Sequence, residues 1–379
     1  VLTECLSQGT SPTSVISFAK EYLKQEGFEE LYYDKMLSGT DGRKYGYLND
    51  DVDLQKVTEE PHNGKTIVST VDINIQRIAE KYISEFMQET GAKNVAALVM
   101  NPNNGEVLGM ASAPVFDLNK PRDLTIAGYT EDQIANMNDQ DMSDALYQVW
   151  RNFCVNDTYE PGSTFKIFTA SAALQSGTST LQDQYYCPGY KIVEDRRIRC
   201  HKAGGHGAED FTHALENSCN PALMTIGLKM GPSLFYQYFS DYGLLTKTGI
   251  DIPGEAATIM HAQENIGEVE LATMTFGQSF QITPLQLITT ASSVINGGRR
   301  VTPHFGVEIR SQEGTTLKTF SWKEKDGILS EKVSDEMREI LEKVVSEGSG
   351  HKAYLEGYRI GGKTATSQTL PRSAHKYIS

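Results

Sequence analysis

The segment from Tyr159 to Gly177, YEPGSTFKIFTASAALQSG, constrains the fold of this chain most. Its Pro-Gly pair ends the preceding structure, and the apolar spacing that follows predicts a buried helix ending at Gly177. Ser163 lies in the first turn, where free backbone N–H groups and the positive end of the helix dipole favour an oxyanion. Lys166 lies one turn later on the same face, where burial would favour the neutral amine and make it a base for Ser163. The segment therefore predicts a serine nucleophile and its base on one helical turn.

This pattern is weak by itself, because a serine followed three residues later by a lysine occurs four times in the chain. The serines are Ser17, Ser163, Ser349 and Ser373. Only the pattern at Ser163 combines a Pro-Gly break, a helix start and an apolar run that would bury the lysine. A catalytic interpretation of Ser163 therefore depends on motifs elsewhere in the chain.

Length and charge limit the classes of protein to consider. A chain of 379 residues is long for a single core, so two domains are expected. The formal net charge of −14 argues against a surface for nucleic acid or anionic lipid. No apolar run approaches the ~18 residues of a membrane span, and no signal peptide opens the chain. If the protein is tethered to a membrane, its anchor lies outside this sequence.

The first part of the chain is polar and rich in turn signals. Residues 1–66 are expected to form a support module, with an amphipathic helix over Ser14 to Gln25 and a boundary loop around Glu59 to Gly64. No cluster of chemically active side chains occurs in this part.

The pattern changes after Thr66. A β-branched strand from Ile67 should lead into a helix over Ile75 to Met87, with Asp72 as its cap. Two apolar runs, Asn94 to Pro102 and Gly105 to Ser112, then flank an Asn-Asn-Gly turn, which is a strong hairpin signal. A central antiparallel sheet should therefore begin just before the serine helix.

Two further motifs follow the serine helix. Ser218-Cys219-Asn220 is the only place in the chain where an asparagine follows a serine two residues later. Near the end of the chain, Lys363-Thr364-Ala365-Thr366 should lie on a short strand after a Gly-Gly bend.

The order of the three motifs resembles that of the class B, monofunctional penicillin-binding transpeptidases, among their elongation- or sporulation-type members. YEPGSTFK resembles the first motif of the family, SCN the second and KTAT the third. Several ordered motifs make the resemblance specific, and it covers most of residues 27–368. Supporting segments are GFEELYYDKMLSGTDG (27–42), TVDINIQ (70–76), VMNPNNGEVLGMASAPVFD (99–117), TGIDIPGE (248–255) and FGQSFQITPLQL (276–287).

The resemblance implies an α+β penicillin-binding transpeptidase fold, with a mainly antiparallel central sheet, helices on both faces and a smaller N-terminal pedestal. Residues 1–66 would be part of the pedestal, and 67–379 the transpeptidase domain, apparently without its C-terminal end. The resemblance also implies a place at the extracytoplasmic face of the bacterial membrane. The protein would be anchored there by an N-terminal helix absent from this chain, with a membrane glycosyltransferase as a partner.

The chemistry that the resemblance implies is acyl transfer. Ser163 would attack the terminal D-Ala-D-Ala bond of a peptidoglycan stem peptide, with Lys166 as base, and form an acyl-enzyme. Ser218 would relay the proton to the leaving amine, and Asn220 would hold the amide of the acyl chain. The amine of a second stem would then take the acyl group to form a cross-link, and β-lactams would inhibit the enzyme. This chemistry requires no cofactor.

The third motif would bind the substrate carboxylate through Lys363, Thr364 and Thr366, since one cation and two hydroxyls suit an anion. The backbone N–H groups of Ser163 and Thr366 would form the oxyanion hole. The usual form of this motif in the family is Lys-Thr-Gly, so Ala365 is a departure that could change the fit of β-lactam or substrate.

The chain contains the literal Lys-Thr-Gly string at Lys247 to Gly249, but it runs directly into a turn sequence. In the family that segment is a non-catalytic loop. We therefore place the third motif at Lys363.

Three of the five cysteines and one histidine predict a metal site. Cys187, Cys200, His206 and Cys219 follow one another at separations of 13, 6 and 13 residues and could close tetrahedrally on Zn²⁺. Some elongation-type members of the family bind a metal at corresponding places. Four protein ligands leave no open position, so the ion would be structural.

Other interpretations of these residues remain open. Cys187 and Cys200 could form a disulfide across their hairpin, with Cys219 simply buried. His201 is a rival ligand to His206, and neither Cys5 nor Cys154 has an obvious partner in the sequence.

Two other functional classes also remain open. A penicillin-hydrolysing or penicillin-sensing protein would share the serine, the lysine and the second motif, but small hydrolases lack the pedestal. A non-catalytic cell-wall scaffold is suggested by Ala365 and by the missing C-terminal strands. Labelling by a fluorescent penicillin would separate a scaffold from an enzyme.

Overall fold

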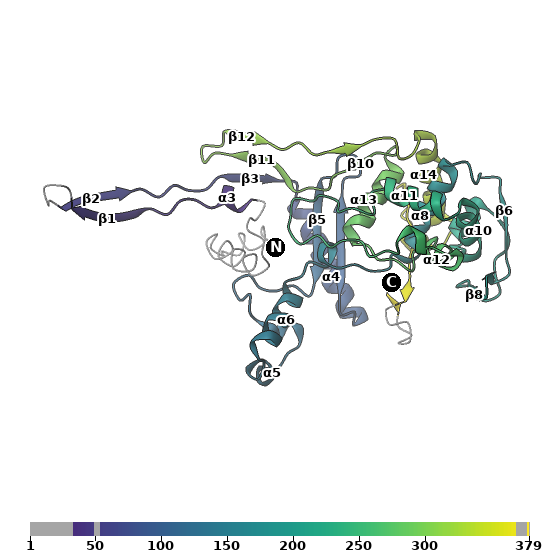
Figure 1. The fold of residues 1–379 in the computed structure, drawn as a ribbon, viewed down its shortest axis with the longest axis horizontal. Helices are drawn as coiled ribbons and strands as arrows, with labels where there is room; N and C mark the ends of the chain where they lie inside the picture. Colours follow the sequence, from purple (N-terminus) through teal and green to yellow (C-terminus); the bar gives the residue numbers. More distant parts are fainter. Residues whose placement is uncertain (1–32, 49–53, 369–376, 379) are drawn as a thin grey trace.

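The computed structural model describes residues 33–48, 54–368 and 377–378, so the helix expected over Ser14 to Gln25 lies outside the described residues. The described chain forms an elongated molecule, with a hairpin arm at one end and a mixed helical and sheet body at the other (Figure 1). Within these residues, no helix combines the length and the apolar character needed to span a membrane.

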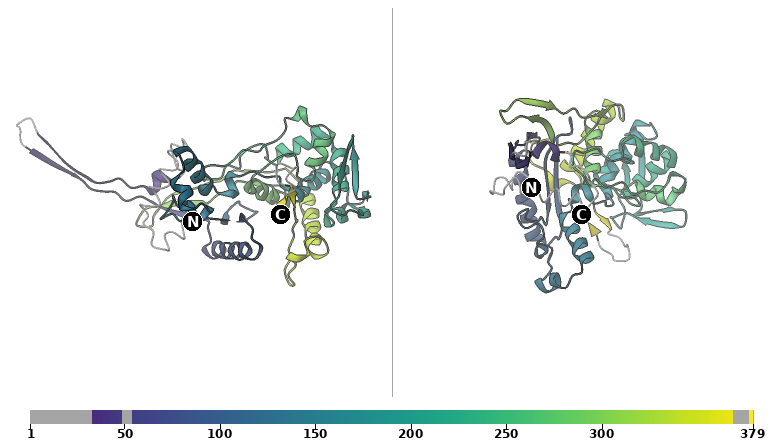
Figure 2. Two further views of the ribbon diagram at one scale, coloured as in Figure 1. Left: turned by 90° about the horizontal axis from the view of Figure 1, so that it is seen from below. Right: turned by 60° about the vertical axis from the view of Figure 1, so that its left-hand side comes forward.

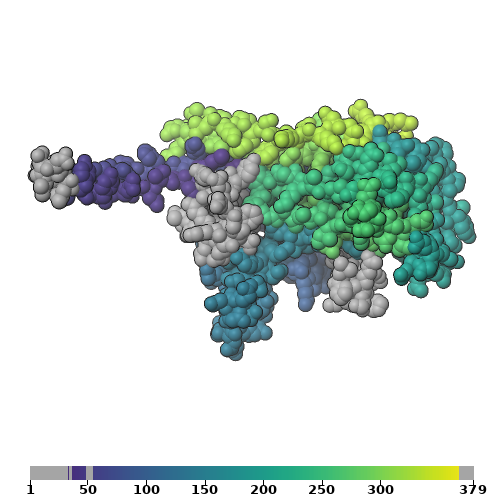
Figure 3. All heavy atoms as spheres, viewed as in Figure 1, coloured from purple at the N-terminus to yellow at the C-terminus, as the bar shows by residue number. Residues whose placement is uncertain are grey.

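The arm is an antiparallel pair of strands, β1 (Arg43–Leu48) and β2 (Leu54–Glu59). It stands clear of the body in the space-filling view (Figure 3) and in the left-hand view of Figure 2. The short helix α3 (Asp34–Leu37) precedes it, and β3 (Thr66–Ser69) follows it. β3 pairs with β11 (Gly306–Arg310), which joins the first part of the chain to a strand from its last third.

Helix α4 (Ile73–Thr90) has the predicted cap, Asp72, but begins two residues before the predicted start at Ile75. The Asp72 carboxylate accepts hydrogen bonds from the N–H groups of Asn74 at 2.8 Å and Ile75 at 3.2 Å, as an N-cap residue does. The helix runs three residues beyond the predicted end at Met87, because it stops only at Gly91, which adopts a left-handed φ of 70°.

The predicted hairpin after α4 is present as β4 (Val95–Met100) and β5 (Val107–Ala113). α4 packs on one face of the hairpin, where a Cβ added at Gly109 of β5 would lie 3.1 Å from Cγ2 of Ile75. Ala96, Leu98 and Met110 share the other face and pack in a core cluster with residues of two further helices. These are α7 (Phe153–Asn156) and α13 (Pro284–Ile295). Helices therefore cover both faces of this hairpin, as the α+β prediction requires.

The serine segment forms a 3₁₀ turn, η2 (Gly162–Phe165), that continues into α8 (Lys166–Gln175). No side chain caps the helix in the usual way, and the Thr164 hydroxyl donates to the Pro161 carbonyl at 2.6 Å. Nearly all of α8 is buried, and it packs against α10 (Asn220–Met230), α13 and α14 (Glu331–Ser346). The serine turn is therefore held at the end of the most deeply buried helix.

The remaining sheets are small and antiparallel, with β6 paired to β9, β7 to β8, β10 to β13, β11 to β12 and β14 to β15. The other elements are η1 (Leu124–Ala127), α5 (Glu131–Ala135), α6 (Asp139–Trp150), β6 (Gln184–Cys187), β7 (Tyr190–Val193), β8 (Arg196–Arg199), β9 (Gly207–Asp210), α9 (Phe211–Glu216), α11 (Pro232–Asp241), η3 (Gln263–Asn265), α12 (Glu268–Met274), β10 (Arg300–Val301), β12 (Thr316–Thr319), β13 (Glu324–Lys325), η4 (His351–Ala353), β14 (Ser367–Gln368) and β15 (Tyr377–Ile378).

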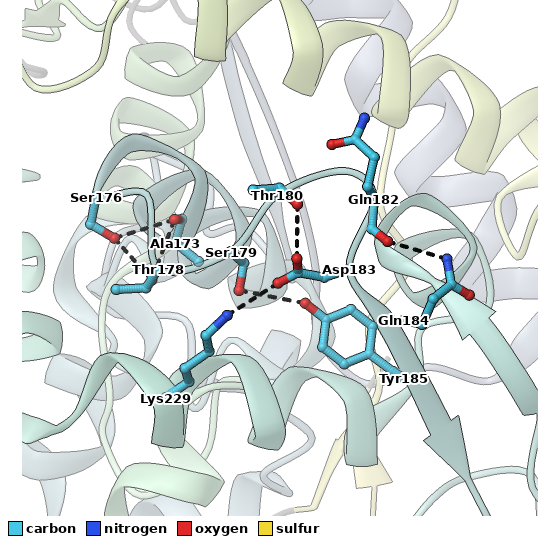
Figure 4. Close-up of polar contacts among 10 residues, drawn as sticks. All are labelled: Ala173, Ser176, Thr178, Ser179, Thr180, Gln182, Asp183, Gln184, Tyr185 and Lys229. Atoms are coloured by element: carbon cyan, nitrogen blue, oxygen red, sulfur yellow. Dashed lines mark hydrogen bonds and ion pairs between the residues drawn. The ribbon is translucent and has the colours of Figure 1, made fainter.

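A polar network fixes the loop between α8 and β6 (Figure 4). Lys229 of α10 forms an ion pair with Asp183 at 3.2 Å, and the Thr180 hydroxyl donates to the same carboxylate at 2.8 Å. The Tyr185 hydroxyl donates to Ser179 at 3.4 Å. These contacts tie the start of β6 to α10, so the cysteine at the end of β6 is placed relative to the SCN motif at the start of α10.

We expect Asp251→Ala to destabilise the fold by about 3 kcal/mol, because a buried carboxylate that accepts several hydrogen bonds would be lost. Asp251 is fully buried and accepts from the N–H groups of Phe305 at 2.8 Å and Gly306 at 2.7 Å, and from the Tyr33 hydroxyl. Denaturant unfolding measures the change, and Asp251→Asn should cost less because one acceptor remains. Equal stability of all three proteins would contradict this role.

Candidate active site

The SCN motif occupies a tight turn between two helices. The N–H groups of Ser218 and Cys219 donate to the carbonyls of Leu215 at 3.0 Å and Ala214 at 2.8 Å, which is the Schellman pattern at the end of α9. Ser218 takes the left-handed position of this pattern, with φ of 51°, where glycine is usual. Cys219 is completely buried and leads directly into α10, which Asn220 begins.

Lys166 connects the serine helix to this turn. Its side chain is fully buried, and Nζ donates to the Ser218 carbonyl at 2.6 Å, the Ser218 hydroxyl at 3.0 Å and Oδ1 of Asn220 at 2.7 Å. Burial lowers the pKa of Lys166 to about 7, and the positive charge of Lys363 contributes to the decrease. A substantial fraction of the amine is therefore neutral near neutral pH, as a general base requires.

A second segment supports the serine turn from the side. The Gly162 N–H donates to the Gly277 carbonyl at 2.9 Å, and a Cβ on Gly277 would lie only 2.0 Å from the Gly162 oxygen. Gly277 also has a left-handed φ of 84°, so a side chain here would be both strained and blocked. This close approach brings Phe276 and Gln278 to the serine.

The three sequence motifs meet in one open cleft with a volume of about 530 Å³. It contains five of the predicted catalytic and substrate-binding residues and several that the sequence did not single out. Its lining residues are Ser163, Ile198, Arg199, Cys200, His201, Ser218, Asn220, Phe276, Gln278, Ser349, Thr364, Ala365 and Thr366. A cleft with a serine, a buried amine and two threonines can support nucleophilic acyl transfer.

The third motif lies beside this cleft but not on a strand, so that part of the prediction is wrong. Lys363 to Thr366 have no ladder partner among the described residues, and β14 begins at Ser367, where it pairs with β15. Lys363 is half-buried, and its Nζ donates to the Thr364 carbonyl at 3.0 Å. Burial lowers the pKa of Lys363 to about 8.

The literal Lys-Thr-Gly string has other contacts. The N–H groups of Thr248 and Gly249 donate to the Glu255 carboxylate at 2.6 and 3.2 Å, and none of the three residues lines the cleft. This geometry agrees with the choice of Lys363 over Lys247.

Sequence reasoning missed several residues of the cleft. Arg199 and His201 come from the hairpin between the first two motifs, and Phe276 and Gln278 from a loop more than a hundred residues after Ser163. Ser349, whose sequence pattern lacks the buried helix that follows Ser163, also lines the cleft, and its N–H donates to the Glu216 carbonyl at 3.0 Å. The glycines on both sides of Ser349 were the available signal for a close approach.

The predicted metal ligands also come together. The ligand atoms of Cys187, Cys200, His206 and Cys219 lie within 4.8 Å of one another, and Cys200 Sγ is 3.7 Å from Nδ1 of His206. All the described cysteines are free, so Cys187 and Cys200 do not form the alternative disulfide. His201 lies 3.9 Å from Cys200 Sγ but faces the cleft, and Cys5 lies outside the described residues.

The chemistry of this cluster fits a zinc ion. Three sulfurs and one imidazole form a usual structural donor set, and all four come from the protein. The Cys219 thiol donates to Cys200, which lowers the pKa of Cys200 and raises that of Cys219, so the pair readily holds one negative charge. Cys154, the other cysteine that the structure describes, is buried in a different core cluster.

Comparison with known proteins identifies relatives over nearly the whole chain. The family profile described as penicillin binding protein transpeptidase domain matches residues 95–379. Stage V sporulation protein D of Bacillus subtilis is 38% identical over 90% of this chain and 51% of its own length. PbpB of Mycolicibacterium smegmatis is 27% identical over 89% of this chain and 50% of its own. The chain thus spans about half the length of these curated relatives.

The same similarity holds for solved structures. Penicillin binding protein 3 of Mycobacterium tuberculosis, solved in complex with aztreonam, is 26% identical and has a TM-score of 0.74. The match covers 91% of this chain and 71% of that one.

Proposed function

Because this chain belongs to the class B penicillin-binding protein transpeptidase family, we propose that it is a serine D,D-transpeptidase that cross-links peptidoglycan stem peptides and is inhibited by β-lactams. The observation that carries the proposal is Lys166, a fully buried amine with a pKa of about 7 that joins the serine turn to the SCN turn. A buried lysine with a lowered pKa next to a serine is a usual way to activate that serine as a nucleophile.

In the proposed reaction, neutral Lys166 accepts the proton of the Ser163 hydroxyl as its oxygen attacks the carbonyl of the D-Ala-D-Ala bond. The Ser218 hydroxyl, 3.0 Å from Nζ, then passes a proton to the departing D-alanine amine. Asn220 holds the amide of the acyl chain, and the N–H groups of Ser163 and Thr366 bind the oxyanion. The amine of a second stem repeats these steps in reverse on the acyl-enzyme.

Lys363, Thr364 and Thr366 would bind the terminal carboxylate of the substrate, with the Lys363 charge as the main attraction. Exposure of Thr364 and Thr366 to the cleft supports this role. The methyl group of Ala365 also lines the cleft, so it would narrow the space next to the bound carboxylate.

We expect Lys363→Ala to slow labelling by a fluorescent penicillin about 100-fold, because a charge-assisted contact to the carboxylate would be lost. The matched control is Lys247→Ala, which removes the same group from the other Lys-Thr string. It should leave the labelling rate nearly unchanged. Slow labelling of the Lys247 variant with normal labelling of the Lys363 variant would mean that the third motif is assigned to the wrong lysine.

We further propose that residues 1–66 belong to a pedestal and 67–379 to the transpeptidase domain. Tyr33 supports a close junction between the two, because its hydroxyl donates to Asp251 and its ring packs edge-on against Phe320 with the ring centres 5.6 Å apart. By analogy with the family, the protein would work at the extracytoplasmic face of the membrane, held by an anchor outside this chain and alongside a membrane glycosyltransferase.

The proposed metal is zinc, and its ligands are Cys187, Cys200, His206 and Cys219. The ion would supply no step of the acyl transfer. Cys219 lies between two residues that contact Lys166, so a metal that held its sulfur would fix the SCN turn from behind. Its removal should then affect the active site through the position of this turn.

Zinc removal is expected to lower the melting temperature and to slow penicillin labelling about 10-fold, and added zinc should restore both under reducing conditions. Elemental analysis should give about one zinc per chain, and the content should fall in Cys219→Ser. Cys154→Ser, which changes a buried cysteine outside the cluster, is the control and should keep its metal. Protein free of metal with full stability and labelling would refute the site.

A further inference from the structure

The hairpin formed by β7 and β8 carries a local excess of positive charge in a chain with a net charge of −14. Between Tyr190 and Lys202 there are two acidic residues, Glu194 and Asp195. The same segment has five basic residues, Lys191, Arg196, Arg197, Arg199 and Lys202. This hairpin forms the end of the body opposite the β1–β2 arm (Figure 1).

The strand register places two of these arginines on one face. Tyr190 pairs with Arg199 and Ile192 with Arg197 across the hairpin, so the four side chains point to the same side. Both arginines are exposed. Their Cα atoms lie about 7 Å apart, since they are two residues apart on an extended strand.

The opposite face of the hairpin is fixed by the core. Val193 is buried in a cluster with Met224 and Phe276, and Ile198 packs against the same cluster. The hairpin therefore cannot rotate to bury its arginines without exposing these apolar side chains. We call Arg197 and Arg199, together with Tyr190, the basic strip.

The charges of the basic strip are not neutralised by the protein. Among the described residues no carboxylate forms an ion pair with Arg197 or Arg199, and the exposed pair within the hairpin joins Arg196 to Asp195 at 3.4 Å. The Arg197 guanidinium lies 3.8 Å from the centre of the Tyr190 ring. This stacking orients the group and leaves its N–H edges available for an anion.

The basic strip begins at the wall of the active-site cleft. Arg199 lines the cleft together with Ser163, and its carbonyl accepts a hydrogen bond from Nδ2 of Asn220 at 3.1 Å. Arg197 precedes Arg199 by two residues on β8 and is not among the residues that line the cleft. A ligand with its reacting end at Ser163 could therefore extend along both arginines.

We propose that the basic strip binds free carboxylates of the stem peptide whose D-Ala-D-Ala end occupies the cleft. This inference rests on the proposed transpeptidase function and adds a preference for stems that keep these carboxylates unmodified. Arginine suits the task because its planar fork binds a carboxylate through two parallel hydrogen bonds. The strip would also orient an acidic peptide, because the net negative charge of the rest of the protein repels the peptide and the two arginines attract it.

The test compares acyl-transfer rates with two stem peptides that both keep the terminal D-Ala carboxylate. They differ only in the carboxylates that precede the D-Ala-D-Ala end, which are free in one peptide and amidated in the other. R197Q, at a position that does not line the cleft, should lower kcat/KM for the free-carboxylate peptide about 10-fold and leave that for the amidated peptide within about two-fold. R197Q/R199Q should lower kcat/KM for the free-carboxylate peptide further, to about 100-fold below that of the unmodified protein. R197K/R199K should recover part of the preference because it keeps the charges. R77Q/K93Q, which removes two positive charges from the region of α4, should behave as the unmodified protein.

Penicillin labelling provides the control for the active site, because a small β-lactam does not need the strip. R197Q, which changes no residue that lines the cleft, should be labelled at the normal rate. Suppose that labelling is normal, but the rates with the two peptides fall equally or do not fall at all. The strip then does not bind the carboxylates, so the inference is overturned and the proposed function stands. If the unmodified protein is neither labelled nor active, both are refuted.

Discussion

Ser163→Ala is expected to abolish covalent labelling by penicillin, with a loss of more than about 1,000-fold, because the variant has no oxygen to form the acyl bond. Mass spectrometry of the unmodified protein should find one adduct, on the peptide that contains Ser163. The variant should carry none. Its stability should change little, because Ser163 is only half-buried and no core group is removed.

Ser349→Ala is the matched control for this experiment. Ser349 lines the same cleft and also has a lysine three residues later, so it shares the sequence pattern and the location of Ser163. It differs in lying after the end of α14 and not at the start of a buried helix. Normal labelling of Ser349→Ala is expected, whereas an adduct on Ser349 would show that the serine was chosen wrongly.

The parts of the fold that sequence predicted are those specified by local signals. Asp72 as a cap, the Asn-Asn-Gly turn and the Pro-Gly break before Ser163 each act through neighbours within a few residues, and each is found where expected. The sequence predicts the end of this helix at Met87, which is too early, because the next residues are compatible with a helix and Gly91 ends it.

The candidate site was predicted as three separate motifs, and only tertiary structure joins them. The approach of Lys166 to Ser218 depends on how α8 packs against α10, which no local pattern encodes. The left-handed conformation of Ser218 also could not be predicted from the sequence, because serine has no preference for it. Lys363 was expected on a strand because its neighbours favour one, but a strand needs a partner that the described chain supplies only from Ser367 onward.

The metal ligands show how far spacing can carry a prediction. The separations of 13, 6 and 13 residues predict a chelate. The pairing of β6 with β9, the end of β8 and the SCN turn bring the four side chains together. The disulfide was the simpler alternative for Cys187 and Cys200. It is not formed, because both sulfurs join a group with His206 and Cys219 and do not bond to each other.

Lys166→Met is expected to slow acylation by penicillin about 1,000-fold, which is the usual range for loss of a positioned general base. Methionine fills a similar space without a charge, so the fold should tolerate it. Because burial and the charge of Lys363 lower the pKa of Lys166 to about 7, acylation of the unmodified protein should rise with pH and be half-maximal near pH 7. The sign follows from the neutral amine being the base: protonation below pH 7 removes its lone pair.

The pH profile also separates Lys166 from Lys363, whose pKa is about 8. If Lys166 is the base, the step near pH 7 should vanish in Lys166→Met. In Lys363→Ala the step should persist and move to higher pH, because a positive charge that disfavours protonated Lys166 is then gone. Measuring second-order acylation rates from pH 5.5 to 9 gives both midpoints. A step that survives in Lys166→Met but disappears in Lys363→Ala would instead identify Lys363 as the titrating group and refute the assignment of the base.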